Sequence, residues 1–133
     1  MKSYTIDSVA FLAFIIDDLP PKADKVLQKA EDDEISLILP SIALGEIIYI
    51  ILKKKEVFGK VIPFEKIITI FEIIRDSESI SLKDMNLECW KNFLEIKIPE
   101  LHDRMIVATH LTYHSVAIIT NDPEIASISN TIW

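Results

Sequence analysis

The chain has little glycine and a single cysteine. Gly45 and Gly59 are its only glycines, so no glycine-rich loop can cradle the phosphates of a dinucleotide or a nucleoside triphosphate. Cys89 excludes an internal disulfide and fits a reducing compartment. Because it lies beside Trp90 in an amphipathic stretch, we expect Cys89 to pack in the core.

Long apolar runs are also missing. The longest, at residues 9–16 and 47–52, are well below the length of a membrane-spanning helix. No basic segment precedes a signal-like stretch, because Asp7 interrupts the start of the chain. We therefore expect a soluble, cytoplasmic protein that does not associate with membranes.

Positive charge is scarce. Lysine and arginine total 14 residues against 21 aspartates and glutamates, which gives a formal net charge of −7 at pH 7. That balance argues against a protein that binds nucleic acid by neutralising many phosphates with basic side chains. A nuclease that contacts phosphate through bound metal ions can nevertheless be acidic. We interpret the one dense basic run, Lys53-Lys54-Lys55, as a solvated helix C-terminus, with a phosphate contact as the alternative.

Apolar residues make up 50% of the 133 residues, enough for a single compact domain over residues 1–133. Short apolar runs predict strands that alternate with helices. This rhythm is typical of a three-layer α/β/α sandwich with a mainly parallel central sheet. We expect strands at residues 4–6, 35–39, 79–82 and 116–120 with a last edge strand at 131–133, and helices at 8–16, 22–33, after an N-cap at Ser41, from Pro63 to 75, at 85–96, from Asp103 to 114 and at 123–128.

Four carboxylates stand inside or against apolar stretches: those of Asp7, Glu46, Asp103 and Asp122. Burying an isolated charge costs roughly several kcal/mol, so such residues are paired, exposed at an element's end, or bound to a metal ion. Asp7 and Asp122 follow predicted strands, and Glu46 and Asp103 lie early in helices entered from the same edge. The sequence therefore predicts that the four acids meet at one divalent-cation site.

Each acid also has a structural interpretation. Asp103 could stabilise a helix N-terminus, and Asp122 could cap the helix that begins at Pro123. Glu46 resists this explanation because leucine and isoleucine surround it, and so does Asp7, which lies in an apolar run. The conjunction of the four favours a shared site.

The histidines suggest a rival. His110 and His114 are four residues apart and could bind Zn²⁺ as a pair on one helix, although no companion His or Cys motif is present. His102, beside Asp103, is interpreted as a surface residue at a helix N-terminus, with a contact to substrate or to a metal-binding residue as the alternative.

Taken in order, these segments resemble the PIN domain, especially the short stand-alone ribonucleases of the VapC toxin type. The resemblance runs from Tyr4-Thr-Ile-Asp-Ser to Ile119-Thr-Asn-Asp. Pro40-Ser-Ile-Ala-Leu-Gly-Glu-Ile looks like the family's second acidic motif, while Leu101-His-Asp-Arg-Met-Ile-Val-Ala-Thr and Ile118-Ile-Thr-Asn-Asp look like the third and fourth. Each motif alone is weak, but the ordered set is specific.

The first motif departs from the family's pattern. The family usually places a small polar residue two positions after its aspartate, and Val9 stands there, while Ser8 retains the preceding hydroxyl position. The change bears on the fine orientation of Asp7 and removes none of the four acids.

The resemblance implies hydrolysis of RNA phosphodiester bonds that depends on Mg²⁺ or Mn²⁺, ions that prefer carboxylate and water oxygens. Asp7, Asp103 and Asp122 would be the nearest ligands. Glu46 would bind through water or hold a second ion, and Thr120 or Asn121 would orient the carboxylates by hydrogen bonding.

The resemblance also implies partners, namely a small antitoxin that covers the cleft and the apolar helices, and a second copy of the chain in a homodimer. The helix predicted from Pro63 is apolar on more than one face, and its surplus Ile70 and Ile73 fit such a contact. A stand-alone RNA-processing nuclease and a non-catalytic PIN-like binding module remain as alternatives.

Overall fold

The computed structural model describes residues 1–133, and a five-stranded parallel sheet lies at its centre. Its strand order is β5-β2-β1-β6-β7, and every neighbouring pair is parallel. Parallel strands are normally covered on both faces, which explains their continuous apolar runs. The strands are β1 (Ser3–Ile6), β2 (Ser36–Pro40), β5 (Ile80–Lys83), β6 (Ile118–Ile119) and β7 (Thr131–Ile132).

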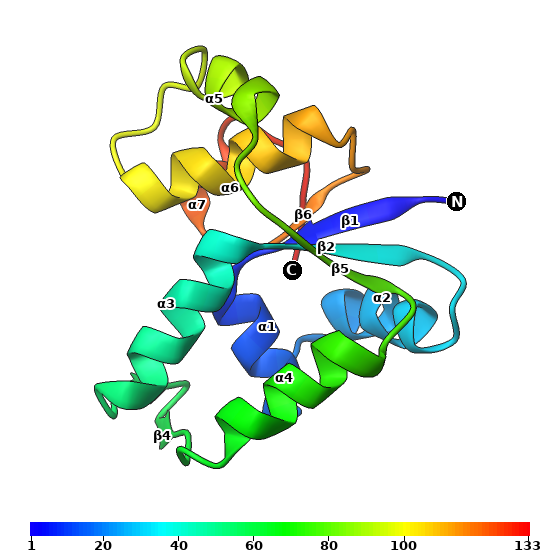
Figure 1. Ribbon diagram of the computed structural model, residues 1–133, viewed down its shortest axis with the longest axis vertical. Coiled ribbons are helices and arrows are strands. Elements are labelled where there is room, and N and C mark those ends of the chain that lie inside the picture. The colour runs from blue at the N-terminus through cyan, green and yellow to red at the C-terminus, as the bar shows by residue number, and fades with distance from the viewer.

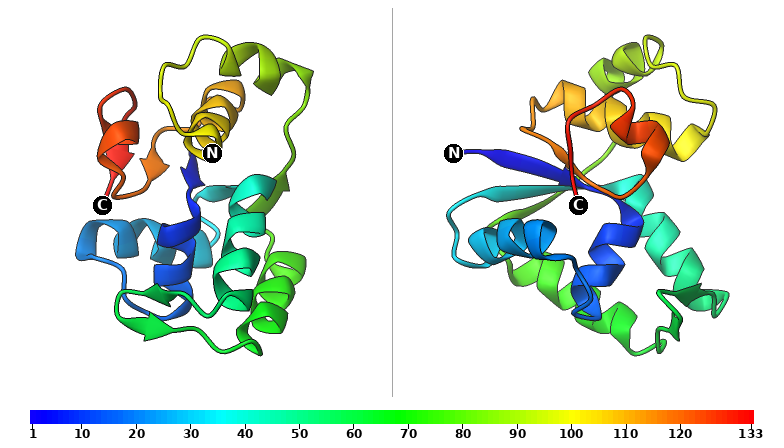
Figure 2. Two further views of the ribbon diagram at one scale, coloured as in Figure 1. Left: turned by 90° about the vertical axis from the view of Figure 1, so that its left-hand side faces the viewer. Right: turned by 180° about the vertical axis from the view of Figure 1, so that it is seen from behind.

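Helices cover both faces of this sheet (Figure 1). One layer contains α1 (Ser8–Ile15), α2 (Pro21–Glu31), α3 (Ser41–Leu52) and α4 (Lys66–Asp76). The other contains α5 (Leu87–Phe93), α6 (Leu101–Thr112) and α7 (Pro123–Ala126), and Figure 2 shows the two layers from further sides. The predicted α/β/α sandwich with a parallel sheet is therefore confirmed. None of the helices combines the length and apolar character that a membrane crossing requires.

The apolar core is divided by the sheet into two clusters. The larger has 18 buried residues, among them Phe11, Leu39 and Ile47, and the smaller has 7, among them Ile106. Ile118 belongs to the smaller cluster and Ile119 to the larger, because successive side chains on a strand point to opposite faces. Cys89 is fully buried, as expected.

Three helices begin elsewhere than predicted. Ser41 is the first residue of α3 and not its cap, because Pro40 precedes the helix while still paired with Lys83 in the sheet. Pro63 starts a turn in which its carbonyl accepts from the Lys66 N–H at 3.0 Å, and α4 begins only at Lys66. α6 begins at Leu101, two residues before Asp103.

Between α3 and α4, where no strand was predicted, lies a small hairpin of β3 (Glu56–Val57) and β4 (Lys60–Val61). Gly59 has a φ of 75° in its turn, a conformation that glycine adopts without strain. α5 is shorter than predicted, because Asn86 caps its start through the Cys89 N–H at 2.9 Å and the helix ends at Phe93.

The apolar surplus of α4 lies on residues other than those predicted. Ile70 is only 1% exposed and belongs to the larger core cluster, so its assignment to a partner surface is wrong, whereas Ile73 is half-buried. Ile68 and Phe71 on α4 are exposed instead, as is Phe64 in the turn before it.

Candidate active site

The four candidate acids come from four different parts of the chain that meet near the carboxyl ends of β1 and β6. Asp7 directly follows β1, and Asp122 follows the neighbouring strand β6 by three residues. Glu46 is carried by α3, which continues directly from β2, and Asp103 lies in the first turn of α6. Asp7 is buried, while the other three acids are partly exposed.

Asp7 is held from two sides. It is the N-cap of α1, and its Oδ1 accepts the Ala10 N–H at 2.8 Å. Its Oδ2 accepts a hydrogen bond from the Thr120 hydroxyl, whose oxygen in turn accepts the Asp122 N–H at 3.0 Å. One threonine after β6 therefore ties the first candidate acid to the backbone of the last.

Asp122 caps α7, as its structural interpretation proposed. Its Oδ1 accepts the N–H groups of Glu124 and Ile125 at 2.8 and 3.1 Å. Because both capping bonds use the same oxygen, capping does not occupy Oδ2. The structural and functional interpretations of Asp122 are therefore compatible.

Glu100, which the sequence analysis missed, caps α6 beside Asp103. Its Oε2 accepts the Asp103 N–H at 2.7 Å. Glutamate is not among the residues preferred at an N-cap, so the sequence carried no clear signal for this role. Glu100 thus adds a fifth carboxylate near the site.

Glu46 also has a partner that the sequence did not reveal. His102 Nδ1 lies 3.2 Å from Glu46 Oε2 and 3.6 Å from Glu100 Oε1. His102 is half-buried, so its interpretation as a plain surface residue is incomplete. This contact joins α3 to the start of α6 and explains how α3 tolerates Glu46.

The acids lie within one another's electric fields. Burial raises the pKa of Asp7 to about 6 against the lowering effect of its bonds with Thr120 and Ala10, and the charges of Asp122 and Glu46 raise it further. Burial raises the pKa of Asp103 to about 7, with further contributions from Asp122 and Glu100. A bound cation would relieve this repulsion.

Burial also raises the pKa of Glu46, which His102 partly offsets. The hydroxyl of the buried Ser8 also favours the ionised form of Glu46 and partly lowers its pKa again. Asn121 is exposed. Val9, which stands where the family's first motif usually has a small polar residue, is half-buried on α1.

The donor atoms at this edge are carboxylate oxygens, which suit Mg²⁺ or Mn²⁺. No three His, Cys, Asp or Glu side chains form a ready-made ligand set, so the acids share a field without being arranged as a closed cage. Asp7, Glu100 and Asp122 each accept backbone N–H groups at the start of a helix. The positive end of the helix dipole therefore favours the ionised form of these carboxylates.

The zinc alternative does not have the expected geometry. α6 ends at Thr112, so His114 lies beyond the helix, exposed and with a φ of 52°. His110 is buried and its Nδ1 is hydrogen-bonded to Ser115 Oγ at 2.6 Å. The i, i+4 pair that the spacing offered as a rival is therefore absent.

A three-layer sandwich with a parallel sheet and clustered carboxylates at its carboxyl edge defines an α/β protein with an acidic centre. The model of one family, described as PIN domain, matches residues 4–130. The chain belongs to the PIN domain family.

Solved structures share this fold over nearly the whole chain. A chain of VapBC2 from Rickettsia felis, solved bound to a DNA fragment from the VapBC2 promoter, has a TM-score of 0.70 and 18% identity to this chain. The match covers 98% of this chain and 96% of the VapBC2 chain. A chain of DNA-bound VapBC from Salmonella typhimurium has a TM-score of 0.65, 16% identity and coverages of 99% and 98%. VapC20 from Mycobacterium tuberculosis, described as a sarcin-ricin loop cleaving toxin, has a TM-score of 0.64, 11% identity and 93% coverage of both chains.

The fold is therefore VapC-like. No curated protein matches the chain in sequence.

Proposed function

We propose that this protein is an endoribonuclease that depends on Mg²⁺ or Mn²⁺ and acts as the toxin of a type II toxin–antitoxin pair. The observation that carries the proposal is the meeting of Asp7, Glu46, Asp103 and Asp122 at one edge of a PIN fold, with the pKa values of Asp7 and Asp103 raised. Groups with strongly shifted pKa values tend to mark functional sites.

In this proposal Asp7, Asp103 and Asp122 hold the ion, and Glu46 binds it through water or holds a second one. A divalent ion at such a site supplies an activated water and offsets charge on the phosphate oxygens. Thr120 fixes the Asp7 carboxylate, Ser8 supports Glu46, and Asn121 is available at the exposed rim to contact a carboxylate or the substrate.

Cleavage of RNA by the purified protein tests the enzymatic part. We expect cleavage of a labelled RNA with Mn²⁺ that EDTA stops and that Asp7→Ala abolishes. Asp84→Ala removes an exposed acid from a loop between β5 and α5 and is the matched control, with cleavage expected to match the wild type. Metal-independent cleavage, or full activity of Asp7→Ala, would contradict the proposal, whereas no cleavage by the wild type would favour a non-catalytic binding module.

The toxin assignment is supported by the similarity to chains named VapC or VapBC, two of which were solved bound to DNA. We accordingly propose an antitoxin partner and action on RNA in the cytoplasm. Induced expression should arrest growth, and co-expression of an antitoxin-like protein from an adjacent reading frame should restore it. Growth that is unaffected while cleavage persists in vitro would favour a stand-alone RNA-processing nuclease.

A homodimer is the further part of the proposal. Phe64, Ile68 and Phe71 are 61%, 54% and 44% exposed, which leaves an apolar surface along α4 and the turn before it. Light scattering coupled to size exclusion should give the mass of a dimer, and Ile68→Lys should convert it to a monomer. A wild-type monomer at micromolar concentration would rule out this part.

A further inference from the structure

The fold shows no structural need for a glycine at position 45. It lies in the middle of α3, where glycine weakens a helix relative to alanine. Its φ is not in the left-handed region, and a Cβ built on it would meet no atom within 4 Å. Nothing in the fold therefore needs the space that a side chain would fill.

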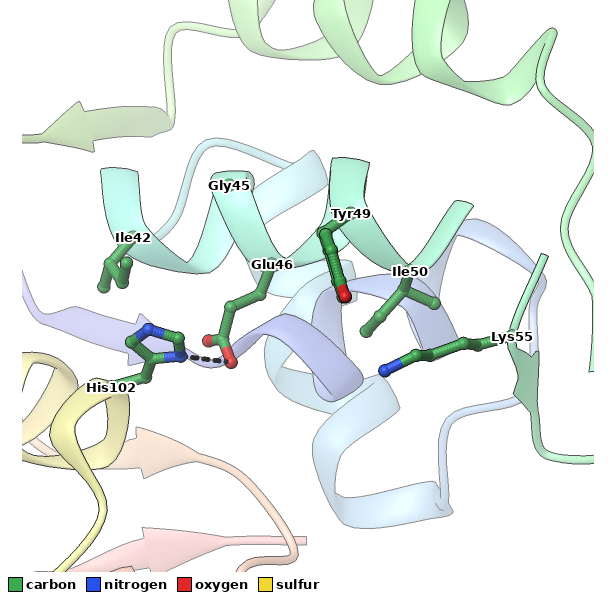
Figure 3. A pocket seen from close by; sticks show the side chains of 7 residues that line it. All are labelled: Ile42, Gly45, Glu46, Tyr49, Ile50, Lys55 and His102. Carbon is green, nitrogen blue, oxygen red and sulfur yellow. Dashed lines mark hydrogen bonds and ion pairs between the residues drawn. The ribbon is translucent and has the colours of Figure 1, made fainter. Parts of the chain in front are cut away.

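That space belongs to a pocket of about 500 Å³ beside the candidate active site. Figure 3 shows Glu46 and His102 joined at one end, with the Tyr49 ring and the Lys55 chain on the same side of α3 toward the other end. The complete lining is Ile42, Gly45, Glu46, Tyr49, Ile50, Lys55 and His102. The pocket thus begins at a candidate acid and leads away from it.

The far end of the pocket combines an open aromatic ring with positive charge. Tyr49 is 52% exposed, and Lys55 Nζ lies 5.0 Å from the centre of its ring. Lys53 Nζ lies 5.7 Å from the same ring. Aromatic rings stack on nucleobases of any sequence, and lysine binds phosphate, so this combination is suited to a single-stranded nucleic acid.

We propose that the pocket over Gly45 holds a nucleotide of the RNA next to the one cleaved, with its base against Tyr49 and its phosphate at Lys55. The missing side chain at Gly45 leaves room for the nucleotide, and Ile42 and Ile50 line the pocket with apolar surface. Tyr49 and Lys55 are then substrate-positioning residues.

Charge favours RNA over a protein segment as the occupant. The chain carries a net charge of −7, and its only dense basic run, Lys53 to Lys55, lies at this end of α3. A phosphate chain that approaches clustered carboxylates needs a cationic contact nearby, and Lys55 supplies one in the lining of a pocket that Glu46 shares. This inference rests on the proposed ribonuclease function.

Binding of a short fluorescein-labelled single-stranded RNA of mixed sequence, measured by anisotropy in an Asp103→Asn background, tests the pocket. Tyr49→Ala should weaken binding by about tenfold through lost stacking, and Tyr49→Phe should recover most of that loss. Lys55→Gln should weaken binding by about fivefold, the upper end of what an exposed ion pair contributes. Lys54→Gln removes an equal charge from a neighbour outside the lining and should change affinity by less than about twofold.

Gly45 supplies a graded second series. Gly45→Ala should keep or raise the melting midpoint, because alanine favours the helix and its Cβ meets nothing. Gly45→Leu should also fold, but it should fill the pocket and weaken RNA binding more than Gly45→Ala does. With the four acids intact, the same variants should raise KM for RNA more than they lower kcat.

The outcomes separate this inference from the proposed function. If the wild type cleaves RNA but Gly45→Leu, Tyr49→Ala and Lys55→Gln bind it as the wild type does, the inference falls and the pocket is left to a protein partner. If the wild type binds RNA without cleaving it, the proposed function falls while the binding series still decides the inference. If the protein neither binds nor cleaves RNA, both fall.

Discussion

Two buried polar clusters lie along β1, and they differ in how they handle burial. In the first, Ser115 Oγ is 2.8 Å from Thr5 Oγ1 and 2.6 Å from His110 Nδ1. In the second, two residues further along the chain from Thr5, Asp7 accepts hydrogen bonds from Thr120 and from the Ala10 N–H. All of these side chains are buried, and each cluster combines one titratable group with hydroxyls, two in the first cluster and one in the second.

The difference between the clusters is charge. Burial lowers the pKa of His110, so the first cluster is neutral at pH 7 and its groups satisfy one another. Burial raises the pKa of Asp7 to about 6, so at pH 7 the second cluster holds a largely ionised acid that other acids face. A fold gains nothing from such repulsion, which is why the second cluster indicates function and the first indicates structure.

The largest effect is expected from a substitution that abolishes the proposed function of the Asp7 cluster but keeps its structure. Asp7→Asn keeps an oxygen that can cap α1 but removes the charge a cation needs, so RNA cleavage should fall by at least about 100-fold. Initial rates with Mn²⁺ measure this, and circular dichroism should show an unchanged fold. Cleavage within about twofold of the wild type would remove Asp7 from the proposed site.

The same substitution should stabilise the protein in EDTA, in a pH-dependent way. Because the pKa of Asp7 is raised from 3.8 to about 6 in the fold, the native state binds more protons than the unfolded state between these values. Its stability contribution is therefore present at low pH and lost as the pH rises through about 6. The advantage of Asp7→Asn over the wild type should grow from near zero at about pH 3 to on the order of 3 kcal/mol at about pH 7.5.

Urea melts of both proteins across this range provide the measurement, and the difference between them is the quantity to follow. The neutral His110 cluster has the opposite slope, because its lowered pKa costs stability as the pH falls below the ordinary histidine value of 6.5. Subtracting the two proteins cancels that contribution. A gap that is independent of pH would show that Asp7 does not titrate abnormally.

A bound divalent ion should offset the repulsion among the four carboxylates and so stabilise the fold. At about 100 times its dissociation constant, Mn²⁺ should stabilise the wild type by about 2.7 kcal/mol, visible as a higher melting midpoint. Asp103→Asn should weaken this shift, whereas the control Asp84→Asn should keep it. An unchanged wild-type midpoint at millimolar Mn²⁺ would count heavily against a shared cation site.

The sequence predicted the layers of the fold better than the starts of its helices. Buried strands such as β2 have unmistakable apolar runs, so the parallel sandwich followed from their alternation with helices. Helix starts depend on local competition. Pro40 remained in the sheet, which made Ser41 the first residue of α3. Glu100 caps α6, so this helix begins at Leu101 and not at Asp103, where it was predicted to begin.

Of the candidate site, the sequence could predict the edge on which the acids lie but not their partners. Asp7 and Asp122 each lie between a strand and the helix that follows it, a position that the local sequence reveals. Both could therefore be assigned to the carboxyl edge of the sheet. The contact between Glu46 and His102 joins residues 56 apart, and no local pattern encodes it. The burial of Ile70 likewise depends on how α4 packs on the core, which periodicity alone does not decide.

The smallest expected effect belongs to the neutral cluster. Ser115→Ala leaves His110 Nδ1 and Thr5 Oγ1 without their shared partner, and unpaired buried polar groups should cost about 1–3 kcal/mol of stability. Thr69→Ala, which removes an exposed hydroxyl on α4, should stay within about 0.5 kcal/mol of the wild type in urea melts. RNA cleavage below the melting range should be unchanged in Ser115→Ala, since only the charged end of β1 is proposed to act on substrate. A loss of cleavage comparable to that of Asp7→Asn would mean that the two clusters are coupled along the strand and that their division into structure and function is wrong.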